Sequence, residues 1–291
     1  MSISGKTKLI GLLGWPVSHS FSPAMHNAAA ESAEIDLVYL GLPLPPNNVS
    51  EGIAGLAALG FSGVNVTIPH KQAVMPHLDT IDEAARVIGA VNTITIERDV
   101  SNGQMTTHLA GYNTDWTGFL GDLDALGVTI QERDCIVLGA GGSARAVVYG
   151  LLQRGGRVHL LARRVAQAEA LIASFGKVID LSEGTHPIAR SLSELSQLNV
   201  ETPLIVNTTP LGMFPNVETS PWPDNLQIPA GSFVYDLVYN PKHTKLMQQA
   251  EAAGCQASHG LGMLLRQGAT AFELWTGVQP DLSVMRDALG W

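Results

Sequence analysis

The chain has 291 residues, of which 45% are hydrophobic and 15% charged, and its formal net charge is −9. This acidic balance argues against a nucleic-acid-binding protein, because contacts with phosphates require basic surface. The polar start at Met1–Lys6 is not typical of a signal peptide, and no run of about 18 apolar residues could cross a bilayer. Cys135 and Cys255 lack metal-ligand spacing. We therefore expect a cytoplasmic protein with no membrane, nucleic-acid or metal partner.

Strand-like and helix-like segments alternate along the first part of the chain. Asn47 is a candidate N-cap for the second helix, and Ser101-Asn102-Gly103 is typical of a hairpin turn. In chain order we predict a strand at 8–14, a helix at 23–32, a strand at 37–44, a helix ending near 59, a strand at 62–68, and a hairpin of 90–98 with 104–110.

The second part of the chain continues the alternation with longer helices. We predict helices at 114–126, 143–153, 165–175, 243–253 and 261–276, and strands at 133–138, 157–162, 204–207 and 232–238. Such alternation predicts an α/β fold, and at roughly 150 residues per domain the length favours two α/β domains.

A glycine-rich turn joins the strand at 133–138 to the following helix. Gly139 allows a tight turn, Gly141 lets the backbone approach a pyrophosphate, and Ala144 lets the helix pack closely on the strand. The N-terminus of that helix offers unpaired N–H groups to an anion. The pattern therefore predicts a dinucleotide site, with an ordinary glycine-rich turn as the alternative.

The residues after the strand at 157–162 favour NADP as the cofactor. An NAD enzyme usually has Asp or Glu there to hold the ribose hydroxyls, whereas this chain has Arg163 and Arg164 and no acid before Glu169. Guanidinium groups bind a 2′-phosphate through paired, charge-assisted hydrogen bonds. The alternative is two solvated surface arginines.

Three loops rich in polar residues, at 18–23, 65–71 and 111–115, suit a small polyhydroxylated ligand. Lys71 and Asp115 are the only lysine–carboxylate pair in these loops. Reducing a ketone with hydride leaves negative charge on oxygen, which an ammonium group can neutralise by giving a proton, and a carboxylate beside it would orient it. The alternatives are a solvated lysine and an N-cap aspartate. His19 and His70 lack partner spacing and are expected in turn or packing roles.

Eight motifs in order resemble those of the shikimate dehydrogenase family, between about Leu9 and Gly277. They are Gly14-Trp15-Pro16 with Ser20-Phe21-Ser22-Pro23, NVTIPHK at 65–71, AVNT at 90–93, GYNTD at 111–115, GAGGSARA at 139–146, NTTPLGM at 207–213, YDLVYNP at 235–241 and GLGMLLRQGATAFELWTG at 260–277.

This resemblance implies NADP-dependent, reversible reduction of 3-dehydroshikimate to shikimate, with Lys71 as the acid–base group and Asp115 beside it. It implies three domain segments: a substrate domain at 1–113, an NADP-binding Rossmann domain at 114–258, and helices at 259–291 that return to the first. The implied substrate residues are Ser20, Ser22, Asn65, Thr67, Asn92, Asp115, Tyr239 and Gln267. The implied cofactor residues are Gly139, Ala140, Gly141, Gly142 and Ser143 at the pyrophosphate, Ala162, Arg163 and Arg164 at the 2′-phosphate, and Thr209, Leu237, Gly260 and Met263 beside the nicotinamide.

Two positions depart from the family pattern. The phosphate loop commonly carries a further arginine where this chain has Gln167, and Trp116 stands where many members have glycine. Two alternatives stay open: a quinate or quinate/shikimate dehydrogenase with relaxed cofactor use, and a non-catalytic sensor on the same fold. A monomer or homodimer is expected.

Overall fold

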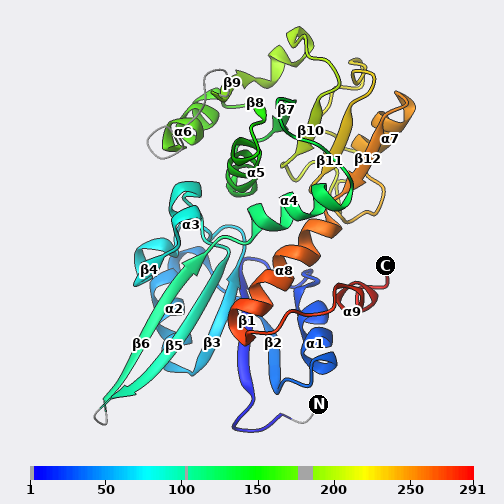
Figure 1. Ribbon diagram of the computed structural model, residues 1–291. Coiled ribbons are helices and arrows are strands. Elements are labelled where there is room, and N and C mark those ends of the chain that lie inside the picture. Colours follow the sequence, from blue (N-terminus) through cyan, green and yellow to red (C-terminus); the bar gives the residue numbers. More distant parts are fainter. Residues whose placement is uncertain (1–2, 102–103, 176–185) are drawn as a thin grey trace. The chain divides into compact units, whose positions relative to one another are not determined.

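The computed structural model describes residues 3–101, 104–175 and 186–291, which form two compact units (Figure 1). The first unit contains Met1–Thr114 and Leu265–Trp291, and the second contains Asp115–Leu264. The sequence placed the boundaries after residues 113 and 258. The second boundary between the two units falls within helix α8, Leu261–Thr276, which is continuous across it.

A six-stranded mixed sheet forms the centre of the first unit, in the order β2-β1-β3-β5-β6-β4. Strand β1 pairs in parallel with β2 and β3, whereas β5 runs antiparallel to both β3 and β6. The strands are β1 Lys8–Gly14, β2 Leu37–Pro43, β3 Phe61–Val66, β4 Thr80–Ile81, β5 Thr93–Ser101 and β6 Gln104–Tyr112. The helices are α1 Ser22–Ser32, α2 Val49–Ala58, α3 Glu83–Ile88, most of α8, and α9 Leu282–Asp287, with short 3-10 helices at Pro46–Asn48 and Met75–His77.

The β5–β6 hairpin confirms the hairpin predicted from the sequence, and Figure 1 shows it as a long arm of the sheet. The turn residues Asn102 and Gly103 lie outside the described residues. The N-cap prediction at Asn47 is wrong. Pro46 starts a short 3-10 helix that contains Asn47, so α2 begins only at Val49, and the residue before it, Asn48, makes no side-chain cap.

The C-terminal segment is part of the first unit's core. Trp275 on α8 donates its indole N–H to the carbonyl of Ile94 at 3.0 Å, and its own carbonyl accepts from the ammonium of Lys8 at 3.1 Å. A side chain at Gly63 would collide with the Trp275 indole, so glycine is needed there for close approach. In addition, α9 packs beside α1. The last residues of the chain therefore complete a core begun by the first.

A six-stranded, fully parallel sheet forms the second unit, in the order β12-β11-β10-β7-β8-β9. Its strands are β7 Asp134–Leu138, β8 Arg157–Ala162, β9 Ile188–Ser191, β10 Leu204–Asn207, β11 Phe233–Asp236 and β12 Gln256–His259. Its helices are α4 Asp115–Ala125, α5 Gly142–Gln153, α6 Val165–Phe175, α7 Lys245–Ala252 and the 3-10 helix Leu192–Gln197. Three strands extend to each side from the β7–β10 junction. This is the Rossmann order, in which ligands bind where the strand order reverses.

The predicted α/β class is confirmed in both units. In the described part of the chain, no helix is both long enough and apolar enough to span a membrane. Trp116 on α4 packs edge-on against Tyr149 on α5, with ring centroids 5.2 Å apart. The departure at Trp116 therefore fills the contact between these two helices.

Candidate active site

The glycine turn lies at the junction where the strand order of the second unit reverses. Gly139 follows β7 with φ of +107°, a conformation that side chains other than glycine rarely adopt. Its N–H donates to the Leu161 carbonyl at 2.8 Å, and a Cβ on it would lie only 2.8 Å from side-chain atoms of Thr208 and Thr209. Both the backbone angle and the close approach therefore require glycine here.

Gly141 has a different environment from Gly139. It precedes α5 with φ of −88°, and among the described residues no atom beyond its own neighbours lies within 4 Å of a Cβ built there. Ala144, one turn into α5, is fully buried, so the helix packs closely on the sheet. Open space in front of Gly141 and the first N–H groups of α5 together fit a pyrophosphate. Ala140, Gly142 and Ser143 complete this turn.

Arg163 and Arg164 lie at the same edge of the sheet as the glycine turn. Strands β7 and β8 are adjacent and parallel, so their paired residues near the carboxyl ends, Leu138 and Leu161, lie at the same edge of the sheet. Ala162 is buried at the end of β8, and the two arginines follow it, exposed, before α6 begins. Two exposed guanidinium groups here fit a 2′-phosphate.

Three of the residues expected beside the nicotinamide lie around the end of β10. The side-chain oxygen of Asn207 accepts from the backbone N–H of Thr209 at 2.9 Å, and the Asn207 carbonyl accepts from the N–H of Leu237 at 3.0 Å. A side chain at Gly260 would collide with the Leu237 backbone. The structure therefore brings Thr209, Leu237 and Gly260 together, and Met263 follows, buried, in the first turn of α8.

In the first unit, Asn65 and Asn92 belong to one buried hydrogen-bond network. Asn65 accepts from the Tyr39 hydroxyl at 2.8 Å and donates to the hydroxyl of Thr93 at 3.0 Å. Thr93 in turn donates to the side-chain oxygen of Asn92 at 3.1 Å. The two amides are thereby held in fixed orientations.

The network extends to Gln267 on α8. Asn92 donates to the Thr114 hydroxyl at 2.9 Å and to the side-chain oxygen of Gln267 at 3.3 Å. It also accepts from the backbone N–H of Thr114 at 2.7 Å. Three of the predicted substrate residues, Asn65, Asn92 and Gln267, therefore lie in one cluster.

Ser20 and Ser22 form a hydrogen-bonded pair at the start of α1. The Ser20 hydroxyl donates to the Ser22 hydroxyl at 3.2 Å and accepts from the Ser22 N–H at the same distance. Ser22 is buried, whereas Ser20 is partly exposed. Two hydroxyls held side by side are suited to a planar carboxylate.

The loop after β3 that carries Thr67 and Lys71 is anchored at several points. The Thr67 N–H donates to the Leu13 carbonyl at 2.8 Å, and the buried His70 ring nitrogen Nε2 is 2.7 Å from the Leu44 carbonyl. The Lys71 carbonyl accepts from the N–H of Val91 at 2.8 Å, which places the Lys71 backbone beside the residue before Asn92. His70 therefore anchors the loop, and the partly exposed Lys71 lies at the same sheet edge as the network.

The remaining two predicted substrate residues, Asp115 and Tyr239, belong to the second unit. Asp115 is buried in the first turn of α4, where the helix dipole favours a carboxylate. It directly follows Thr114, the last residue of the first unit's network. Tyr239 lies in the loop after β11, and burial raises the pKa of its phenol.

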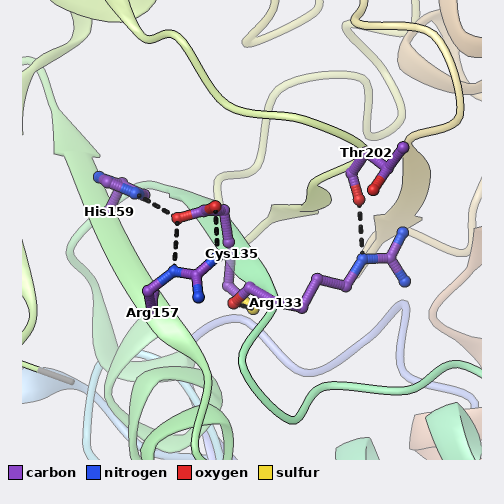
Figure 2. Close-up of polar contacts among 6 residues, drawn as sticks. Arg133, Cys135, Arg157, His159 and Thr202 are labelled. Carbon is purple, nitrogen blue, oxygen red and sulfur yellow. Dashed lines mark hydrogen bonds and ion pairs between the residues drawn. The ribbon is translucent and has the colours of Figure 1, made fainter. Parts of the chain in front are cut away.

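A charged cluster lies at the opposite edge of the second unit's sheet. The Asp134 carboxylate accepts two hydrogen bonds from Arg157, at 2.8 and 3.2 Å, and lies 3.1 Å from the ring of His159 (Figure 2). The Arg157 hydrogen bonds hold the pKa of Asp134 below its usual value. These residues sit at the start of β7 and in β8, so the cluster lies away from the glycine turn.

Several residues that organise the site were not identified from the sequence. Tyr39, Thr93 and Thr114 carry the network of the first unit, and Asn207 with Asp236 carries that of the second. Asn207 and Asp236 stand inside two of the family motifs, which was a usable signal. Tyr39 lies in an ordinary apolar strand and had none.

The strand order, the glycine turn and the paired arginines define a dinucleotide-binding α/β protein of two units. Residues 12–94 match the model of the shikimate dehydrogenase substrate binding domain, and residues 260–289 match that of the shikimate 5′-dehydrogenase C-terminal domain. The NADP-type shikimate dehydrogenase of Moorella thermoacetica is 43% identical, over 100% of this chain and 96% of its own length. The chain belongs to the shikimate dehydrogenase family.

Two solved structures extend the likeness to three dimensions. A crystal structure of a shikimate dehydrogenase in complex with NADP+ has a TM-score of 0.87 and 39% identity, and covers 99% of this chain and 96% of its own. The Thermus thermophilus enzyme in complex with NADP(H) and shikimate has a TM-score of 0.82 and 37% identity, and covers 97% of this chain and 98% of its own.

Proposed function

We propose that this chain catalyses the NADP-dependent, reversible reduction of 3-dehydroshikimate to shikimate. The observation that carries the proposal is full-length identity of about 40% to NADP-type shikimate dehydrogenases. Most of the proposed substrate residues belong to the first unit, and all of the proposed cofactor residues belong to the second.

Lys71 is the proposed acid–base group. NADPH, when bound, supplies the hydride to the ketone carbon of the substrate. The Lys71 ammonium donates a proton to the oxygen as negative charge develops on it, and in the reverse direction the neutral amine accepts that proton. Asp115 is proposed to lie beside the ammonium and orient it.

The substrate's other groups are assigned to the buried network and to the serine pair. Ser20 and Ser22, already paired at 3.2 Å, bind the carboxylate. Asn65, Thr67, Asn92, Tyr239 and Gln267 bind ring hydroxyls or the carboxylate. Because Asn65 and Asn92 are held by Tyr39, Thr93 and Thr114, their amides need little reordering when the substrate binds.

The cofactor is assigned to the carboxyl edge of the second unit's sheet. The turn from Gly139 to Ser143 binds the pyrophosphate, and Arg163 with Arg164 binds the 2′-phosphate beside Ala162. Thr209, Leu237, Gly260 and Met263 line the nicotinamide end. The exposure of both arginines and the open space at Gly141 support this assignment.

The direct test is oxidation of shikimate or quinate by the purified chain with NADP or NAD, followed by nicotinamide absorbance. We expect shikimate with NADP to give the highest kcat/KM of the four combinations. A highest value for quinate or for NAD would favour the quinate alternative. Tight binding of shikimate without turnover by any combination would favour a non-catalytic sensor.

A further inference from the structure

Asp236 is a buried carboxylate at the end of β11, next to the proposed cofactor site. It is 0% exposed. One oxygen, Oδ1, accepts from the side-chain amide of Asn207 at 2.8 Å and from the N–H of Val238 at 3.0 Å, and the other, Oδ2, accepts from the Thr244 hydroxyl at 2.7 Å. Burial raises its pKa to about 6. Burying a carboxylate costs free energy of desolvation, so Asp236 is expected to have a role beyond packing.

The Asp236 carboxylate helps to fix which way the Asn207 amide faces, together with the Leu211 carbonyl, which accepts from the same NH2 group at 3.2 Å. Asn207 is 0% exposed and directs its NH2 group at Asp236. Its oxygen therefore faces the other way, where it accepts from the N–H of Thr209 at 2.9 Å and from the Thr209 hydroxyl at 2.7 Å. A reversed amide would set its oxygen against a carboxylate oxygen and its NH2 against a donor, so the reversed state is excluded.

The Thr208–Thr209 turn held by Asn207 is in contact with the glycine turn. Thr208 donates to the Leu138 carbonyl through its N–H at 2.9 Å and its hydroxyl at 2.8 Å. The missing side chain of Gly139 leaves the space that Thr208 and Thr209 occupy. A displacement of this turn would therefore reach the nicotinamide end and the pyrophosphate end of the site together.

We propose that Asp236 is a positioning residue for the dinucleotide, acting through Asn207 on the Thr208–Thr209 turn. The inference rests on the proposed function, since it assigns NADP to that turn. The relay requires an oxygen acceptor facing Asn207, and the negative charge is not required. An uncharged amide at 236 can present such an oxygen, and the Thr244 hydroxyl can rotate to accept from its NH2 group.

The test compares three variants of the full chain. Asp236→Leu keeps the number and branching of the side-chain heavy atoms and removes the acceptor, Asp236→Asn keeps the acceptor and removes the charge, and Thr244→Val removes a hydrogen bond to the opposite carboxylate oxygen. The dissociation constant of NADP is measured by titration calorimetry, together with the KM of shikimate and the urea midpoint of unfolding.

We expect Asp236→Leu to weaken NADP binding about tenfold, the loss of one positioned hydrogen bond, with little change in the KM of shikimate. Asp236→Asn should bind NADP within about threefold of wild type. Thr244→Val, which also loses the cap that its hydroxyl provides to Met247 on α7, should lower the urea midpoint and leave NADP binding within about twofold.

Three results would overturn the inference. They are wild-type NADP affinity in Asp236→Leu, a tenfold loss in Asp236→Asn, or a loss in Thr244→Val equal to that of Asp236→Leu, which would indicate general loosening. The second result decides the matter even if Asp236→Leu does not fold. Absence of wild-type turnover with shikimate and NADP would instead refute the proposed function, so the two failures are distinguishable.

Discussion

The imidazole of His26 stacks on the phenol ring of Tyr39, with ring centroids 4.4 Å apart and planes inclined by 9°. The Tyr39 hydroxyl donates to Asn65, so the stacked pair lies directly behind a proposed substrate residue. His26 is 0% exposed, and burial lowers its pKa to about 3. The ring therefore stays neutral in the folded protein over the physiological range.

This buried histidine predicts a loss of stability on mild acidification. The unfolded chain takes up a proton at His26 near pH 6.5 and the folded chain only near pH 3, so the unfolded state binds more protons in between. The free energy of unfolding should therefore fall as pH drops, by about 2 kcal/mol from pH 6.5 to 5 from this group. His26→Phe keeps a stacked ring that cannot be protonated, and urea unfolding at several pH values should show a shallower dependence. Equal slopes for the two proteins would contradict the prediction.

Replacing Lys71 should separate substrate binding from proton transfer. We expect Lys71→Ala to lower kcat by roughly 10²- to 10⁴-fold, the usual cost of losing an acid–base group. Lys71→Arg keeps the positive charge but does not release a proton near neutral pH, so it should lower kcat similarly while changing the KM of shikimate less. Steady-state kinetics with shikimate and NADP measure both values. Full turnover in either variant would remove Lys71 from the mechanism.

Removing the two arginines after β8 should shift the choice of cofactor. In Arg163→Ala combined with Arg164→Ala, the KM of NADP should rise by roughly tenfold or more, because charge-assisted hydrogen bonds to the 2′-phosphate are lost. The KM of NAD should change little, since NAD lacks that phosphate. The comparison is the ratio of kcat/KM for the two cofactors, and Gln167→Ala serves as the neighbouring control. An unchanged ratio would refute the phosphate role.

The two glycines of the pyrophosphate turn should respond differently to alanine. Gly141→Ala meets no described atom beyond its own neighbours within 4 Å, so its thermal midpoint should match wild type while the KM of NADP rises by roughly tenfold. Gly139→Ala would be strained by its φ of +107° and pressed against Thr208 and Thr209, and should lose more than about 1 kcal/mol of stability. Unchanged NADP kinetics in Gly141→Ala would argue that the cofactor binds elsewhere.

The ion pair between Arg157 and Asp134 should contribute stability that acid removes. Because the folded pKa of Asp134 is lowered, its contribution is present above about pH 4 and is lost as pH falls through the folded pKa. Arg157→Ala should cost at most about 1 kcal/mol at pH 7, since Arg157 is half exposed and solvent screens the pair. Arg154→Ala is the matched control, since Arg154 is as exposed as Arg157. Its partner Asp124 is more exposed than Asp134, so Arg154→Ala should cost less stability. A difference between Arg157→Ala and wild type that does not shrink as the pH falls below about 4 would contradict this account.

Elements with strong local signals were predicted from the sequence with accurate bounds. The strand at Arg157–Ala162, the helix at Val165–Phe175 and the helix at Leu261–Thr276 match the structure at both ends. Each has a long apolar pattern bounded by Gly, Pro or charged residues. The glycine turn was recognised for the same reason, since its spacing carries its own physical meaning.

Short elements were missed because long-range pairing stabilises them. Strand β4 has two residues and forms only by pairing with β6, and β12 has four and forms beside β11. Helix α3 had detectable signals, since Asp82 caps its first turn and Gly89 ends it with φ of +69°. In the site, residue types were predictable, but the partners of Asn65 and Asn92 were not, because those contacts join segments far apart in sequence.

The second unit is inserted between two segments of the first, and this has a consequence for biosynthesis. A ribosome completes Asp115–Leu264 before it has made the α8 segment that carries Trp275, whose indole occupies the space beside Gly63. The Rossmann sheet is thus free to form during translation. The contact between Trp275 and Gly63 in the first unit, in contrast, can form only after the α8 segment leaves the exit tunnel.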